Sequence, residues 1–116
     1  MFDFERLDLY SVMRNQNMKV LLLLNSHATL DVYLREQWRR ASVGSVLNLA
    51  EGVGRIVEEE KRQFITLARG NIFECTALLQ MAYDLKFVEM EKYEELYANY
   101  EQISKMLLGM YRSKSQ

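Results

Sequence analysis

The sequence contains no proline in its 116 residues. Proline removes a backbone donor and clashes with the helix interior, so its absence permits long uninterrupted helices. Hydrophobic residues make up 49% of the chain, and strong helix formers such as Leu, Met, Glu, Lys and Arg are frequent. These features favour an all-α fold over strands joined by tight turns. A chain of this length has room for one domain with one hydrophobic core.

Apolar residues recur at helical spacing in four segments separated by short polar connections. We predict helices at residues 4–25, 31–53, 58–85 and 89–111. Four helices with short connections predict an up-down-up-down antiparallel four-helix bundle, with residues 1–116 forming a single domain.

Several residues predict local contacts within this bundle. Thr29 or Asp31 suits the N-cap of the second helix, and Gly52 and Gly54 suit a left-handed exit from it. Gly70 interrupts the third helix, and we expect it to lie against the middle of the second helix, where small side chains permit close approach. These small residues are Ala41, Ser42, Gly44 and Ser45.

The run from Leu21 to Leu24 is apolar on every side of the first helix. It predicts burial on two sides, either deep in the bundle or between the bundle and a neighbouring subunit. The apolar stretch from Val20 to Leu24 is too short to span a membrane. The single cysteine, Cys75, cannot form an internal disulfide, and the N-terminus has no signal-peptide pattern, which together predict a cytoplasmic protein.

The charge is nearly balanced overall but unevenly distributed. The formal net charge is −1, which argues against a wholly basic nucleic-acid binder. Residues 35–69 carry seven basic side chains against five acidic ones, whereas residues 70–104 carry two basic against seven acidic. This asymmetry suits either a polyanion site or charge-matched contacts between subunits.

Catalytic and metal chemistry have little support in the sequence. The only histidine, His27, falls in a predicted loop, where we expect a solvated side chain. Cys75 lies on the apolar side of the third helix and is predicted to be a small core residue. A di-iron bundle needs two Glu-x-x-His pairs, which one histidine cannot supply. We therefore predict no enzymatic activity, no catalytic residue, no cofactor and no metal.

A polar segment follows the middle of the second helix. Asn48 and Glu51 stand at i,i+3, and Glu51 and Arg55 at i,i+4, so the three can share one edge of that helix. We interpret these residues as part of a buried or interfacial polar network that fixes helix register and subunit contacts. The alternative is that the arginines face a phosphate or another ligand. The predicted network consists of Asn48, Glu51, Arg55, Arg69 and Glu74.

Several blocks of this sequence resemble a known family. They are Arg39-Arg40-Ala41, Asn48 to Arg55 (NLAEGVGR), Phe64, Leu67 to Gly70 (LARG), Glu74, and Glu101 to Leu107 (EQISKML). They resemble the 23S rRNA intervening-sequence proteins, also called the four-helix bundle protein family. The resemblance implies a homo-oligomer, specifically a homopentamer. Relatives of that family include accessory proteins of diversity-generating retroelements, which bind nucleic acid and a reverse transcriptase.

Together these observations predict a homo-oligomeric helical bundle that binds RNA or DNA through an arginine-rich surface. The alternative is an oligomeric scaffold for a protein partner, such as an element-encoded polymerase, with the basic residues used in subunit or partner contacts. Neither hypothesis involves a membrane. The candidate nucleic-acid contacts are Arg35, Arg39, Arg40, Arg55, Lys61, Arg62 and Arg69.

Overall fold

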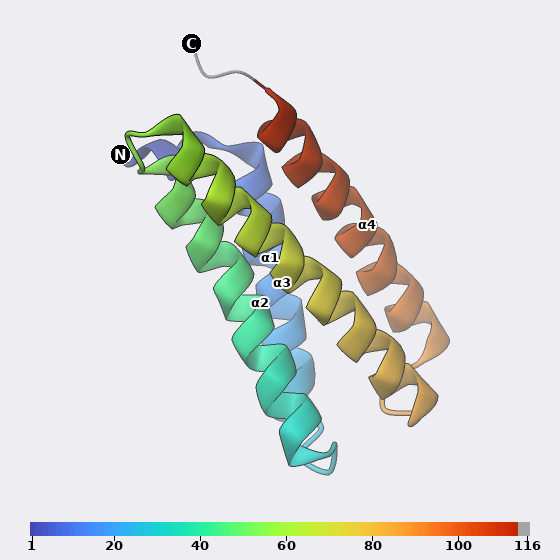
Figure 1. The fold of residues 1–116 in the computed structure, drawn as a ribbon. Helices are drawn as coiled ribbons and strands as arrows, with labels where there is room; N and C mark the ends of the chain where they lie inside the picture. The colour runs from blue at the N-terminus through green and yellow to red at the C-terminus, as the bar shows by residue number, and fades with distance from the viewer. Residues whose placement is uncertain (114–116) are drawn as a thin grey trace.

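The computed structural model describes residues 1–113. It contains a short 3-10 helix, Asp3–Arg6, and four α-helices: α1 (Asp8–Ser26), α2 (Val32–Val53), α3 (Glu58–Asp84) and α4 (Met90–Arg112). In Figure 1 each helix runs back along the one before it, and contacts follow the ring α1–α2–α3–α4–α1. Residues 1–113 contain no strand. The predicted all-α four-helix bundle is therefore confirmed.

The first helix begins later than predicted. Leu7 has extended backbone angles, φ −83° and ψ 128°, and separates the 3-10 turn from α1. The turn places the ring of Phe4 edge-on against Tyr10, with the ring centroids 4.9 Å apart. The prediction of a continuous helix from residue 4 is therefore wrong over its first turn, because an aromatic contact competes there with helix continuation.

The two ends of α2 gave one correct prediction and one error. The Asp31 carboxylate accepts hydrogen bonds from the backbone N–H groups of Tyr33 (2.9 Å) and Leu34 (3.2 Å), which confirms it as the N-cap. At the other end, Gly54 has φ −80° and ψ −8°, in the right-handed region. The predicted left-handed exit is wrong, because the Gly54 N–H donates to the Glu51 carbonyl at 3.2 Å within right-handed geometry.

The left-handed residue lies instead at the end of α3. Lys86 has φ 66°, and the next residue, Phe87, donates its N–H to the carbonyl of Ala82 at 3.0 Å. This bond closes the last turn of α3 in the pattern usually associated with glycine.

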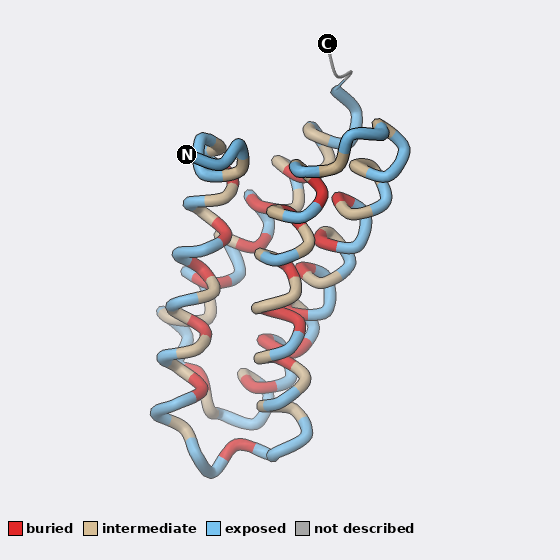
Figure 2. Tube along the Cα trace, turned by 90° about the vertical axis from the view of Figure 1, so that its left-hand side faces the viewer, coloured by how far each residue is buried: buried red, intermediate tan, exposed pale blue. Residues whose placement is uncertain are grey.

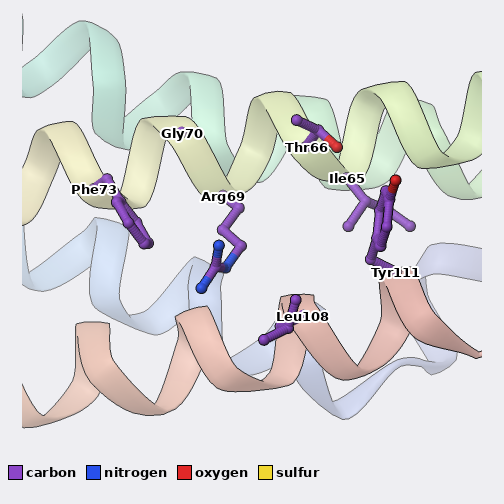
Figure 3. A pocket seen from close by; sticks show the side chains of 7 residues that line it. All are labelled: Ile65, Thr66, Arg69, Gly70, Phe73, Leu108 and Tyr111. Atoms are coloured by element: carbon purple, nitrogen blue, oxygen red, sulfur yellow. The ribbon is translucent and has the colours of Figure 1, made fainter.

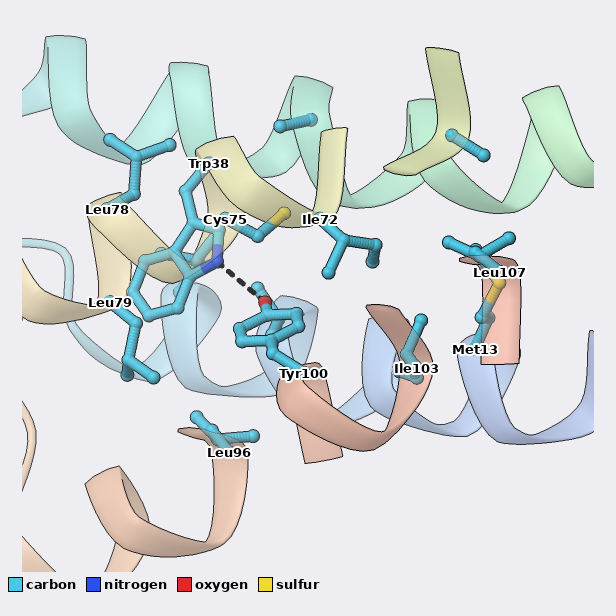
Figure 4. Close-up of a cluster of buried hydrophobic side chains, with 14 of the residues drawn as sticks. Met13, Trp38, Ile72, Cys75, Leu78, Leu79, Leu96, Tyr100, Ile103 and Leu107 are labelled. Atoms are coloured by element: carbon cyan, nitrogen blue, oxygen red, sulfur yellow. Dashed lines mark hydrogen bonds between the residues drawn. The ribbon is translucent and has the colours of Figure 1, made fainter. Parts of the chain in front are cut away.

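Buried side chains lie along the inner faces of the helices, as the red segments of Figure 2 show. Trp38 and Tyr100 are among the largest of them, and the indole N–H donates to the Tyr100 hydroxyl at 3.0 Å (Figure 4). This bond satisfies the indole N–H of Trp38, which would otherwise be buried without a partner. Each large side chain removed from water contributes roughly 1.5–3 kcal/mol to folding, so the core holds the bundle together.

The helices α2 and α3 approach each other closely. A Cβ added at Gly52 would lie 2.7 Å from the Cβ of Phe64, and one added at Gly44 would lie 3.3 Å from the Asn71 side chain. The small residues of α2 therefore do permit close approach, as predicted. Gly70 does not take part, because no atom of a neighbouring helix lies within 4 Å of its Cβ position. The prediction for Gly70 is wrong, since Asn71, the next residue around the helix, faces α2 instead.

The run from Leu21 to Leu24 is only partly enclosed within one chain. Leu24 is buried, whereas Leu22 is 61% exposed. Deep burial of the whole run in the bundle is therefore wrong for the single chain, and the neighbouring-subunit alternative stays a prediction. As far as residues 1–113 go, no helix combines the length and apolarity needed to cross a bilayer.

Candidate nucleic-acid interface

The basic residues of α2 and α3 are divided between separate parts of the molecule. Arg35 and Arg39 lie in the first half of α2, whereas Arg55 lies just beyond its end. With a rise of about 1.5 Å per residue, Arg39 and Arg55 are about 24 Å apart along the helix axis. The candidates thus extend along the length of the bundle and do not gather at one point.

Arg35 and Arg39 face the connection between α1 and α2. The Arg35 guanidinium donates to the backbone carbonyl of Ala28 at 2.7 Å, and that of Arg39 donates to the side-chain oxygen of Asn25 at 3.2 Å. Both acceptors are neutral. The two arginines are therefore positioned by hydrogen bonds while their positive charge remains uncompensated.

Arg40 and Arg55 are paired with carboxylates. Arg40 lies 3.0 Å from Glu74, across the boundary between α2 and α3. Arg55 lies 3.2 Å from Glu51, as the i,i+4 spacing predicted, and 3.9 Å from Glu60. All these side chains are well exposed, and such surface pairs stabilise a fold by only about 0–1 kcal/mol.

The five residues predicted to form a polar network are dispersed within one chain. Among them, only Glu51 and Arg55 are joined by an ion pair or hydrogen bond in residues 1–113. Asn48 donates to the side-chain oxygen of Asn71 at 2.8 Å, which ties α2 to α3. Arg69 and Glu74 turn to opposite sides of α3. Sequence spacing had identified the polar positions, but it could not identify their partners.

Arg69 lies in a groove between α3 and the C-terminal half of α4, shown in Figure 3. Its Nε donates to the backbone carbonyl of Ser104 at 3.3 Å, and its guanidinium carbon lies 4.7 Å from the centre of the Phe73 ring. The groove has a volume of about 340 Å³. It is lined by Ile65, Thr66, Arg69, Gly70, Phe73, Leu108 and Tyr111.

The second arginine near this groove is Arg62, one helical turn before Thr66. Its guanidinium carbon lies 5.7 Å from the centre of the Tyr111 ring, and its Nε has no hydrogen-bond partner although it is buried. Phe73 and Tyr111 are 55% and 41% exposed. Two aromatic rings, each beside an arginine, therefore face the same groove.

Our sequence interpretation did not identify Phe73 and Tyr111 as site residues. The signal for Phe73 was its i,i+4 spacing from Arg69, which places the two side chains on one face of a helix. No comparable signal existed for Tyr111, because its position beside α3 depends on how α4 packs.

The remaining candidates for chemistry are held in structural roles. Burial raises the pKa of the Cys75 thiol to about 12, so the thiol stays protonated and unreactive near neutral pH. His27 is half-buried, with Nδ1 2.9 Å from the Leu23 carbonyl, so the expectation of a freely solvated side chain is wrong. Across residues 1–113, no group of three or more His, Cys, Asp or Glu side chains is arranged to hold a metal ion.

Comparisons with known proteins agree with this fold. A family model described as 23S rRNA-intervening sequence protein matches residues 5–109. The structure is similar to the crystal structure of a protein of unknown function from the S23 ribosomal protein family of Bacteroides thetaiotaomicron. The TM-score is 0.85 at 13% sequence identity, and the match covers 90% of this chain and 99% of that one. No functionally curated protein matches the chain.

Proposed function

The chain belongs to the 23S rRNA-intervening sequence protein family, and from this premise we propose that it is a non-enzymatic, homo-oligomeric bundle that binds nucleic acid. The observation that carries the proposal is that most of its candidate basic side chains have no acidic partner. Five of the seven candidates have no carboxylate within salt-bridge distance in residues 1–113. Uncompensated cations of this kind neutralise phosphates and release counterions. They are Arg35, Arg39, Lys61, Arg62 and Arg69.

The outer face of α1 supports the homo-oligomer. Met18 and Leu22 are exposed there, and the hollow around them contains one charged side chain, Arg14. Covering this face with a second copy would remove the apolar surface from water, and the resemblance to pentameric proteins suggests a pentamer. Several copies of a modest basic surface then act together, which raises the overall affinity without any new contact.

The compartment we propose is the cytoplasm. Cys75 is the only cysteine of the chain, so the fold relies on no internal disulfide and suits a reducing environment.

The experiment combines size-exclusion chromatography with light scattering, in the presence of a labelled single-stranded RNA or a duplex DNA. We expect an oligomer that co-elutes with nucleic acid at low salt and releases it at moderate salt. Substituting Arg35→Gln and Arg39→Gln together should lower the slope of log affinity against log salt by about two. Arg40→Gln is the matched control, because Arg40 is already paired with Glu74. An affinity that does not change with salt would contradict the proposal.

A protein-binding scaffold is the second candidate. The connection between α2 and α3 carries Ile56, which is 96% exposed, beside the exposed Val57. The N-terminal 3-10 helix contacts α2, and the exposed Phe2 directly precedes it. Exposed apolar side chains at one end of the bundle are typical of a protein contact. An oligomer that binds neither the single-stranded RNA nor the duplex DNA at low salt would favour the protein-binding scaffold.

A further inference from the structure

The geometry of the α3–α4 groove points to a stacking site for single-stranded nucleic acid, in which bases lie on Phe73 and Tyr111 and phosphates meet Arg62 and Arg69. We propose this as the way the chain distinguishes a single strand from a duplex. The inference rests on the proposed function and assigns it a strand form and a set of contact residues.

The aromatic rings are accessible in the way that stacking requires. Phe73 is 55% exposed and Tyr111 is 41% exposed, so each presents ring surface to solvent. Gly70 forms the wall between them, and open space surrounds its Cβ position. Figure 3 shows both rings and the Arg69 side chain on the side of α3 that faces α4. A planar base can therefore approach the rings without displacing the core.

The cations beside the rings are available to phosphates. The Nε of Arg69 donates to the Ser104 carbonyl, which fixes the guanidinium, while its terminal nitrogens have no hydrogen-bond partner in residues 1–113. Arg62 has a buried Nε that no group in residues 1–113 satisfies. The exposed Lys105 and Arg112 lie three residues before and four residues after Leu108, so they share its side of α4.

Acidic residues limit the length of the site. Glu58 and Glu59 lie beyond Arg62 at one end, and Glu101 lies beyond Phe73 at the other. Between Arg62 and Phe73 the helix rises about 16 Å, which accommodates roughly four or five stacked nucleotides at about 3.4 Å each. In a duplex the base faces are covered by neighbouring bases, so only a single strand offers the rings a stacking partner.

A second copy of the chain is the competing occupant. It would have to cover Arg62 and Arg69, and burying cations without partners is costly. The outer face of α1, with exposed Met18 and Leu22, offers the chain a less charged surface for self-contact. Charge complementarity therefore favours a polyanion in the groove.

The experiment measures fluorescence anisotropy of labelled ten-nucleotide single-stranded RNA, single-stranded DNA and duplex DNA with the full-length oligomer. We expect tighter binding of the single strands than of the duplex. Phe73→Ala and Tyr111→Ala should each weaken single-strand binding about tenfold and leave duplex binding nearly unchanged. The matched control is Tyr33→Ala, which removes an exposed aromatic ring outside the groove and should change neither. Arg69→Gln should lower the salt slope by about one.

The outcomes separate the two proposals. Normal single-strand binding by the Phe73→Ala and Tyr111→Ala variants overturns the groove assignment and leaves the nucleic-acid proposal standing. Equal affinity for duplex and single strand also overturns the groove assignment. Dissociation of the oligomer on Phe73→Ala, measured by light scattering, assigns the groove to a second copy instead. Absence of binding by the unsubstituted protein at low salt removes the proposed function itself.

Discussion

The two sides of α3 differ in how closely a neighbouring helix approaches. On the α2 side, glycines let the backbones come close enough for Phe64 and Asn71 to contact Gly52 and Gly44. On the α4 side, the helices leave a groove of about 340 Å³ beside Gly70. Glycine thus lies in a tight contact where α2 meets α3, and beside open space where α3 faces α4. A glycine by itself does not identify a close approach, because the facing helix decides what it meets.

The two sides of α3 also differ in whether their polar and aromatic groups are free to bind a partner. The α2–α3 contact is dense and uses its polar groups internally, as the bond between Asn48 and Asn71 shows. The α3–α4 groove keeps exposed ring surface and uncompensated cations. Substitutions in the two places should therefore have opposite effects on stability.

The largest effect is expected at the close contact. Gly52→Ala places a methyl group 2.7 Å from the Cβ of Phe64, which cannot rotate away as a side-chain tip could. Overpacking of this kind costs about 1–3 kcal/mol, offset by up to about 1 kcal/mol of improved helix propensity. We expect a net loss of about 1–2 kcal/mol in the free energy of unfolding, measured by urea denaturation. An unchanged or higher stability would mean that α2 and α3 can separate at this point without penalty.

The next effect concerns the polar bond across the same contact. Asn48→Ala removes the donor to Asn71 and should lower the free energy of unfolding by about 1 kcal/mol. Asn71→Ala should have a similar effect, and the double variant should lose less than the sum of the two. A coupling of about 0.5–1.5 kcal/mol in this double-mutant cycle would measure the bond. Strict additivity would show that the two side chains act independently.

The smallest effect is expected on the open side. Gly70→Ala adds a methyl group in the middle of α3, where no atom of a neighbouring helix lies within 4 Å. The substitution should raise the free energy of unfolding by about 0.5–1 kcal/mol, because alanine loses less backbone entropy in a helix than glycine. Destabilisation would instead indicate that another chain packs against Gly70, and light scattering of the variant would then show a smaller particle.

Much of the fold followed from local sequence patterns. Helix-forming composition without proline predicted the four helices, the carboxylate of Asp31 predicted a cap, and the i,i+4 spacing predicted the pair of Glu51 and Arg55. The left-handed turn was misplaced. It occurs at Lys86 and not at Gly52 or Gly54, and the N–H of the following residue closes the last turn of α3 on the Ala82 carbonyl.

The candidate site was predictable only in part. Arg62 and Arg69 were identified as basic side chains, but their aromatic neighbours were not. Arg62 on α3 lies beside Tyr111 on α4, and these residues are far apart in sequence. No local sequence pattern relates two residues that are so far apart in the chain.

The sequence by itself determined the four helices, the Asp31 cap and the pair of Glu51 and Arg55, because these depend on neighbours within about four residues. The tertiary structure decided which of the remaining residues face a helix, a groove or solvent. Neighbouring positions on a helix differ by about 100° in direction, so a single step turns Asn71 toward α2 and Gly70 toward open space. That direction is fixed by the packing of all four helices together.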